Sequence, residues 1–346
     1  MRLFSLIAGL FFILGSLSAC GGKEKSAVAQ VSRSAEMVKQ GDELFNDNKQ
    51  SEALEIYQAA ADSALAEKDN ASLVEAYSQV ARCYLSMDEK EEGRPWLAKA
   101  EAAATDSEPL GWTRYLGVKG RYLWKDAAEK QGEDAPVVEE AAKIFSGLYD
   151  YARAHQSYNS AVDAANMMSI VAQPEERIEW GLKGIKAAEE GGLESWMAPL
   201  WNNLGWNYSD LGRYDESLEA LKKARRYHYK KGLEKPMLIS DWSVAYALRM
   251  DGQPDSSIAW CMRIVPWAKD LYDEDPTPEN AEWLGKCYQV LAEASLDKGN
   301  DRRAIAGFRS AQIYFDKTDM RNRDDKEYNE LLEKIKQLEA KPKGGR

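Results

Sequence analysis

The chain is poor in the residues on which most catalytic and metal sites depend. Its 346 residues include only two His and four Cys. Neither His155 nor His228 lies near a second candidate ligand or a nucleophile motif, and the cysteines form no CxxC pair and no metal-ligand spacing. A glycine-rich phosphate loop is also missing, because the glycines fall where helices are expected to end or to cross. We therefore expect no enzyme activity, no metal and no cofactor, and we expect both His side chains at the surface or at helix ends.

Positive charge is scarce as well. Lys and Arg number 46 against 57 Asp and Glu, which gives a formal net charge of -11. Nucleic-acid binding generally needs a strongly basic surface, so we expect no nucleic-acid partner. The acidic run Asp273 to Asp275 lacks the alternating spacing that places carboxylates around Ca²⁺. We expect residues 272–280 (YDEDPTPEN) to form a solvated loop.

Only one stretch of the chain is strongly hydrophobic, and it lies at the N-terminus. Residues 3–14 follow Arg2 and are too few to span a membrane, which takes about 20 residues. The stretch ends in Leu17-Ser18-Ala19-Cys20, which resembles the signal peptide of bacterial lipoproteins. The resemblance implies cleavage before Cys20 and acylation of Cys20, and several acyl chains give stable anchoring. The alternative is an ordinary cleaved signal followed by a chance Cys.

This resemblance sets the expected location and the first boundaries. Residues 1–19 would be the cleaved signal peptide, and residues 20–33 the lipidated Cys with a short polar tether. Residue 21 is Gly, and not the Asp that keeps some related lipoproteins from the outer membrane. We therefore expect a protein of the bacterial cell envelope, anchored by lipid, in the outer membrane and facing the periplasm.

The other three cysteines, Cys83, Cys261 and Cys287, lie in apolar helical patterns. We expect them to be buried as small hydrophobic residues. A disulfide between Cys261 and Cys287 on adjacent helices is the alternative.

A pattern of small residues recurs along the rest of the chain. Steps of 40, 39, 45, 40, 40 and 47 residues separate Gly41, Ala81, Gly120, Ala165, Gly205, Ala245 and Ala292. The linker Gly192-Leu193-Glu194 recurs 40 residues later as Gly232-Leu233-Glu234. A near-constant period is typical of a stacked repeat array.

Each repeat contains two helical patterns. In residues 198–224 the first pattern places apolar residues at Trp201, Leu204 and Tyr208, and a turn follows at Gly212. The second pattern contains Leu218, Leu221 and Ala224. Small residues at the crossing let the two helices approach closely, so we interpret the intervals as packing intervals.

This pattern resembles the tetratricopeptide repeat family. The matching positions in the repeat described above are Trp201, Leu204, Gly205, Tyr208, Gly212, Tyr214, Leu221 and Ala224. The resemblance implies an all-α, right-handed superhelical solenoid of about seven helix-turn-helix repeats over residues 34–318. The usual repeat has about 34 residues, so the step near 40 indicates a long variant. The longer steps hold an insertion at residues 125–136 and the expected loop at residues 272–280.

The last segment, residues 319–346, contains a further helical pattern. Tyr328, Leu331, Leu332, Ile335 and Leu338 lie on one stripe. We expect a helix over residues 326–341 that caps the last repeat, since the end of an array needs a cover. A coiled coil that binds a partner is the alternative.

The family resemblance also implies a binding groove on the concave face. Five positions of each first helix point into it in that family, and here they would present Arg82, Arg121, Trp124, Lys125, Asn166, Asn202, Trp206, Trp242, Tyr246 and Arg249. Asn can bond a peptide backbone, Arg and Lys can hold a carboxylate, and Trp and Tyr are frequent binding anchors. The alternative is that Trp124, Trp206 and Trp242 simply pack between helices.

We therefore expect a membrane-anchored envelope scaffold that binds a protein or peptide partner in this groove. A carbohydrate-binding lipoprotein that stacks peptidoglycan or oligosaccharide rings on Trp124, Trp206, Trp242 and Tyr246 is one alternative. A purely structural spacer that binds neither ligand is another.

Overall fold

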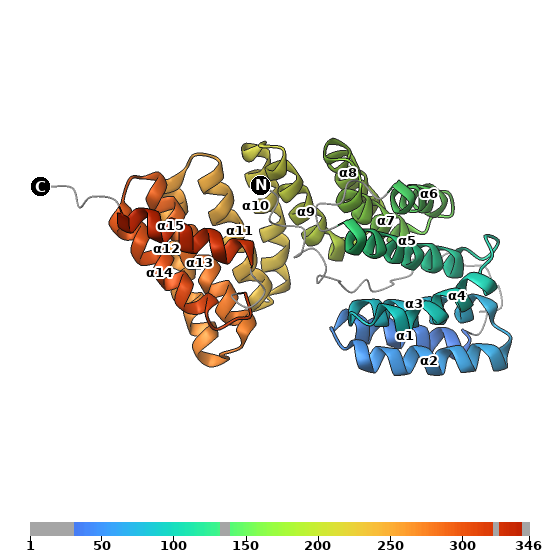
Figure 1. Cartoon of the computed structure of the whole chain (residues 1–346). Coiled ribbons are helices and arrows are strands. Elements are labelled where there is room, and N and C mark those ends of the chain that lie inside the picture. Colours follow the sequence, from blue (N-terminus) through green and yellow to red (C-terminus); the bar gives the residue numbers. More distant parts are fainter. Residues whose placement is uncertain (1–30, 132–138, 321–324, 341–346) are drawn as a thin grey trace, which may run out of the picture. The chain divides into compact units, whose positions relative to one another are not determined.

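The structure is a computed structural model that describes residues 31–131, 139–320 and 325–340. Over these ranges the regular structure is entirely helical (Figure 1). The contacts divide the chain into two compact units, one ending at Asn203 and one beginning at Leu204, inside α9 (Met197–Asp210). We call them the N-terminal and the C-terminal unit. The expected signal peptide, residues 1–19, and the expected lipidation site, Cys20, lie outside the described residues.

The N-terminal unit is a succession of helix pairs. Its helices before α9 are α1 (Arg33–Asn46), α2 (Gln50–Glu67), α3 (Asn70–Ser86), α4 (Lys90–Ala103), α5 (Pro109–Gln131), α6 (Glu139–Ala154), α7 (Tyr158–Val171) and α8 (Pro174–Glu190). Each helix packs on the next, and the first helices of the pairs also pack on one another, α1 on α3, α3 on α5 and α5 on α7. In the described residues no comparable contact joins α2, α4 and α6. The first helices therefore form one layer of the unit, which we call its first-helix face.

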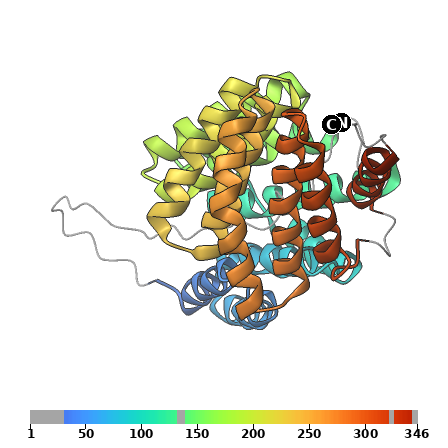
Figure 2. The ribbon, with the colours of Figure 1, turned by 90° about the vertical axis from the view of Figure 1, so that its left-hand side faces the viewer.

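The C-terminal unit continues the same pattern. Its helices after α9 are α10 (Tyr214–Lys231), α11 (Glu234–Met250), α12 (Pro254–Glu274), α13 (Pro278–Asp297), α14 (Asp301–Phe315) and α15 (Lys326–Ala340). The helices α11 to α14 lie side by side (Figure 2), and the first helices α11 and α13 contact each other. The first-helix face of this unit is therefore built from α11 and α13, with the second half of α9.

The recurring small residues lie where two helices of a repeat cross. A Cβ atom on Gly41 would lie 2.5 Å from Cε1 of Tyr57, and one on Gly205 would lie 2.6 Å from Cγ of Leu221. The alanines at the equivalent positions of other repeats are fully buried: Ala81, Ala165, Ala245 and Ala292. These contacts confirm that the intervals in the sequence are packing intervals.

Many of the turns between helices use the left-handed backbone conformation. Gly212, where the sequence predicts a turn, has a φ value of 71°, and Gly192 and Gly232 of the repeated linker have φ values of 64° and 69°. Lys68 and Gln156 adopt the same conformation without the freedom of glycine, with φ values of 58° and 55°. The turns at Lys68 and Gln156 therefore carry more backbone strain than those that end in glycine.

Two expectations about the connections need correction. Residues 272–280 are not a continuous loop, because α12 extends to Glu274 and α13 begins at Pro278. Proline is compatible with the first turn of a helix, and the side chain of Thr277 caps α13 by accepting a hydrogen bond from the backbone N–H of Asn280. The expected insertion at residues 125–136 begins as helix, since α5 continues to Gln131, and residues 132–138 lie outside the described ranges.

The C-terminal helix caps the last repeat, as predicted. Tyr328, Leu331, Ile335 and Leu338 of α15 join a buried cluster with residues of α13 and α14, including Phe308. The cap removes from water an apolar surface that the end of the stack would otherwise expose.

Cys83, Cys261 and Cys287 are buried free thiols. Burial raises the pKa of each thiol, which keeps it protonated. None of the helices in the described ranges combines the length and the apolar character needed to cross a membrane.

Candidate functional site

In the N-terminal unit, the first-helix face carries a network of buried and half-buried polar side chains. Arg114 of α5 forms ion pairs with Asp42 of α1 and, through Nε at 3.3 Å, with Oε2 of Glu75 in α3. The hydroxyl of Tyr57 and the amide of Gln79 donate to Oδ1 of Asp42, at 2.6 and 2.7 Å. One carboxylate thus accepts hydrogen bonds from three other helices of the unit.

Burial governs the ionisation of this network. Desolvation raises the pKa of Glu75, although Arg114 acts in the opposite direction. Desolvation and the nearby Asp42 raise the pKa of Tyr57, so its hydroxyl remains a hydrogen-bond donor. Because these groups form hydrogen bonds and ion pairs with one another, their first role is to hold α1, α3 and α5 together.

A second charged group on this face joins α5 to α7. Arg121 donates from Nη2 to Oδ1 of Asp163 at 2.6 Å and from Nη1 to Oδ2 at 3.0 Å. Burial alone would raise the pKa of Asp163, but Arg121 holds it below its usual value. Burial and the proximity of Arg121 lower the pKa of Arg82 to about 10, and Arg82 lies 4.8 Å from the ring centre of Phe45.

In the C-terminal unit, the first-helix face of that unit carries aromatic side chains. The ring centres of Trp206 and Tyr246 are 5.3 Å apart, and that of Trp242 lies 5.9 Å from each. Trp283 of α13 meets Trp242 edge-on at 5.5 Å. We call these four residues the aromatic cluster. Trp242 is only 3% exposed and donates from Nε1 to the carbonyl oxygen of Lys286 at 3.2 Å, whereas Trp206 and Tyr246 are half-buried.

Acidic residues of α13 neutralise the cation beside this cluster. Arg249 donates to Oε2 of Glu293 and to Oδ2 of Asp297, both at 2.7 Å, and Lys334 of α15 donates to the other oxygen of Glu293 at 2.6 Å. Burial lowers the pKa of Arg249, but the two acids raise it by more, so the guanidinium remains charged. Arg249 therefore lies within an ion-pair network at the margin of the aromatic cluster.

The structure brings some of the predicted groove residues together and separates others. Trp206, Trp242 and Tyr246 meet in one cluster, and Arg82 lies near Arg121. Asn166 accepts a hydrogen bond from Asn203 at 2.8 Å, and Asn202 is half-buried. Trp124 packs against the hydrophobic core around Phe145, and Lys125 forms an exposed ion pair with Asp88 at 3.3 Å.

Several members of these networks were not predicted from the sequence. Asp42 and Glu293 each follow the recurring small residue of their repeat, as Arg82 and Arg121 do. Glu75 and Arg114 each lie six residues before it. The same periodicity could therefore have found all four. The partner Asp163 carries no comparable signal, because its role depends on where the side chain of Arg121 points.

His228 lies at a helix end, as expected, but it is buried. It is 7% exposed in the last turn of α10, and burial lowers its pKa to about 4. The side chain is therefore neutral at physiological pH. His155, in contrast, stacks on Tyr151 at the end of α6, with ring centres 4.1 Å apart. No group of three or more His, Cys, Asp and Glu in the described ranges is arranged to hold a metal ion.

Comparison with known proteins fits this geometry. The family model of the tetratricopeptide repeat matches residues 198–230, the repeat made by α9 and α10. The chain is a tetratricopeptide repeat protein. Repeats of this family generally form scaffolds for protein binding and not catalytic sites, and their stacked helices offer extended surfaces to a partner. No curated protein matches the chain by sequence.

Solved structures share the fold at low sequence identity. A signal-transduction ATPase of Pyrococcus horikoshii with a tetratricopeptide repeat sensor matches with a TM-score of 0.63 and 14% identity, over 88% of this chain and 44% of that one. The apo form of RapI matches with a TM-score of 0.52 and 12% identity, over 88% and 85% of the two chains. Aspartyl phosphate phosphatase F of Bacillus subtilis matches with a TM-score of 0.51 and 12% identity, over 91% and 80%. This chain thus spans less than half of the P. horikoshii protein, and the likeness to all three concerns the fold.

Proposed function

We propose that this tetratricopeptide repeat protein is a lipid-anchored scaffold of a bacterial cell envelope, which binds a protein partner on the first-helix face of its C-terminal unit. The aromatic cluster supports this proposal most directly. Trp206 and Tyr246 are half-buried beside the fully packed Trp242, so they can cover an apolar side chain of a partner without rearrangement. Half-buried aromatic residues held by a rigid layer lose little conformational freedom on binding.

The charged residues of the two first-helix faces contribute less to this proposal. Arg121 and Arg249 already bind carboxylates of the same chain, so a partner would have to replace an existing ion pair. That exchange would add specificity and little affinity. We therefore assign the binding energy to Trp206 and Tyr246.

The same arrangement weighs against a glycan ligand. Stacking of sugar rings needs the open face of an aromatic ring, and Trp242 is packed between Trp206, Tyr246 and Trp283. The side chains next to the cluster are the charged groups of the Arg249 network, which offer no aromatic ring to a sugar. We therefore prefer a protein partner.

The anchor at Cys20 and the location in the envelope rest on the N-terminal sequence alone. The sequence of residues 3–20 supports both, because a short apolar stretch runs directly into Leu17-Ser18-Ala19-Cys20. The outer membrane, facing the periplasm, is the location we propose.

The test is capture of a partner by the full-length protein, followed by measurement of binding with the purified partner. We expect the double variant Trp206→Ala, Tyr246→Ala to weaken binding at least about tenfold, as loss of an anchor does. Trp267→Ala is the matched control, because Trp267 is a half-buried aromatic residue on the second helix α12. Equal binding by all variants, each shown by circular dichroism to be folded, would remove the first-helix face from consideration.

A further inference from the structure

The second half of α10 concentrates positive charge in an acidic protein. Residues 222–231 (KKARRYHYKK) contain six Lys or Arg and no acid, while the net charge of the chain is -11. The helix dipole favours cations in the last turn of a helix, which accounts for Lys230 and Lys231. It does not account for Arg226, which lies more than one turn before the end of α10.

Some of these charges are used within the fold. Lys222 binds Glu219 at 2.9 Å, and Arg225 forms an ion pair with Asp241 of α11. Arg226 and Arg263 of α12 differ, because both are exposed and neither forms a salt bridge with any acid of the described residues. The carboxylate of Glu219 lies near Arg226 but pairs with Lys222. One guanidinium group on α10 and one on α12 are thus left without a paired carboxylate among the described residues.

Aromatic residues of α10 and α12 lie against further guanidinium groups. Arg225 lies 5.4 Å and Arg263 lies 4.8 Å from the ring centre of Trp260, so one indole ring is flanked by two guanidinium groups. Arg225 also lies 4.0 Å from the ring centre of Tyr229, whose hydroxyl donates to Asp241 at 2.6 Å. The helix α12 therefore contributes a cation, Arg263, and not an acid beside the ring of Trp260.

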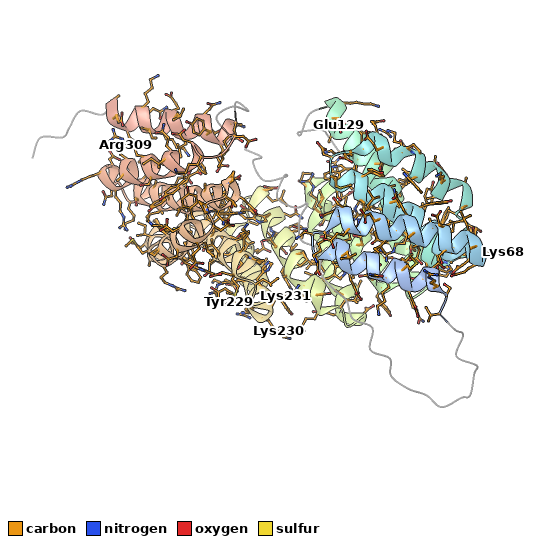
Figure 3. The ribbon with its side chains drawn as sticks, turned by 90° about the horizontal axis from the view of Figure 1, so that it is seen from below. Lys68, Glu129, Tyr229, Lys230, Lys231 and Arg309 are labelled. Atoms are coloured by element: carbon orange, nitrogen blue, oxygen red, sulfur yellow. The ribbon has the colours of Figure 1, made fainter. Side chains whose placement is uncertain are left out.

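Tyr229, Lys230 and Lys231 lie together at the end of α10 (Figure 3). Tyr229 is 38% exposed, and Lys230 is exposed as well. These residues extend the positive charge of Arg226 along the outer side of the helix. The result is a mixed basic and aromatic surface on second helices, separate from the aromatic cluster on first helices.

We propose that this surface binds an acidic segment of a partner protein. We define the α10–α12 basic surface as Arg226, Tyr229 and Lys230 of α10 with Trp260 and Arg263 of α12. Guanidinium groups can hold carboxylates through two parallel hydrogen bonds, and the rings supply apolar contact beside them. A combination of Arg, Tyr and Trp is typical of protein interfaces, whereas docking on lipid depends mainly on Lys and on apolar side chains that enter the bilayer.

The test uses a fluorescent 16-residue peptide in which Glu alternates with Leu and Gly, added to the full-length protein and followed by fluorescence anisotropy. We expect binding that weakens as salt is raised, because exposed charges are screened. The double variant Arg226→Glu, Arg263→Glu should weaken binding at least about tenfold. Both side chains are exposed, so the variant should keep the circular dichroism spectrum of the parent.

The matched control is Lys39→Glu, Lys68→Glu, which changes the net charge equally on exposed residues of the N-terminal unit (Figure 3 labels Lys68). It should change binding less than about twofold. Equal weakening of binding by both double variants would show that only net charge matters, and it would overturn the proposal. Absence of peptide binding would overturn it as well. Binding to phosphatidylglycerol vesicles that depends on Arg226 and Arg263, without peptide binding, would assign the surface to lipid and overturn it too.

Discussion

Gly205 of α9 faces Leu221 of α10 so closely that a Cβ atom on Gly205 would lie 2.6 Å from Cγ of Leu221. The two helices of this repeat therefore cross at a contact that admits only hydrogen at position 205. Leu221 is 1% exposed, so its side chain has little room to move away. Gly205 precedes Trp206 in α9, so the same contact helps to position the indole ring of Trp206 in the aromatic cluster.

Gly205→Ala should destabilise the protein by about 1 to 3 kcal/mol, the usual cost of forcing a methyl group into a packed core. Gly147→Ala is the control, because Gly147 lies within α6 and a Cβ atom there meets nothing within 4 Å. That change should stabilise the helix by about 0.5 to 1 kcal/mol. Urea unfolding measures both. Similar effects of the two substitutions would contradict the packing argument.

Arg114→Ala should destabilise the protein by about 3 kcal/mol, because it leaves Asp42 and Glu75 as unpaired carboxylates in a mostly buried site. The control is Lys119→Ala on the same helix, whose partner Glu101 is half-exposed. Exposed ion pairs contribute less than about 1 kcal/mol, so this variant should remain close to the parent. Urea unfolding at neutral pH would reject the prediction if both variants had the same stability.

His228 should make the protein less stable in mild acid. Its pKa is lowered to about 4 in the folded state, while the unfolded chain has a value near 6.5. The unfolded state therefore takes up a proton first as the pH falls. The stability that neutral His228 contributes is fully present above pH 6.5 and decreases as the pH falls toward 4. The free energy of unfolding should fall by about 2 kcal/mol between pH 7 and 5.

His228→Gln should remove this part of the pH dependence, whatever its effect on stability at pH 7. His155→Gln, at an exposed site, is the control and should leave the dependence as it is. The measurement is the difference in unfolding free energy between pH 7 and pH 5 for the three proteins. An unchanged difference in His228→Gln would show that other groups cause the acid sensitivity.

Cys20→Ala should abolish the incorporation of labelled palmitate and move the protein from the membrane to the soluble fraction of a bacterial host. The reason is that acyl chains add about 0.8 kcal/mol of membrane affinity per buried CH₂ group, and none would remain. Cys83→Ala is the control, because that thiol is buried in α3. Label that persists in Cys20→Ala would contradict the lipoprotein interpretation.

The sequence predicted the repeats well because packing at a crossing demands a small residue at a fixed interval. Gly41 and Gly205 show this, since each faces a large side chain of its own repeat. The ends of helices were less predictable. An acidic stretch with two prolines is typical of a loop, yet Pro278 lies in the first turn of α13, where its missing N–H costs nothing.

The polar contacts were the least predictable part of the site. Periodicity placed Arg121 on the first-helix face, but the conformation of its side chain decides that it binds Asp163. The burial of His228 escaped notice for a similar reason, because it depends on the helices packed around the end of α10. Such properties arise from three-dimensional neighbours that a one-dimensional pattern does not contain.

The ion pair between Arg114 and Asp42 restricts how repeats could have been duplicated or lost during evolution. A repeat array usually tolerates duplication or loss of one unit, because each unit contacts only its neighbours. Here a side chain of the third repeat reaches the first, past α3. Deletion or duplication of the α3–α4 repeat would set different residues opposite Arg114. We therefore expect the first three repeats to have been inherited as a block, with their number fixed once this pair had formed.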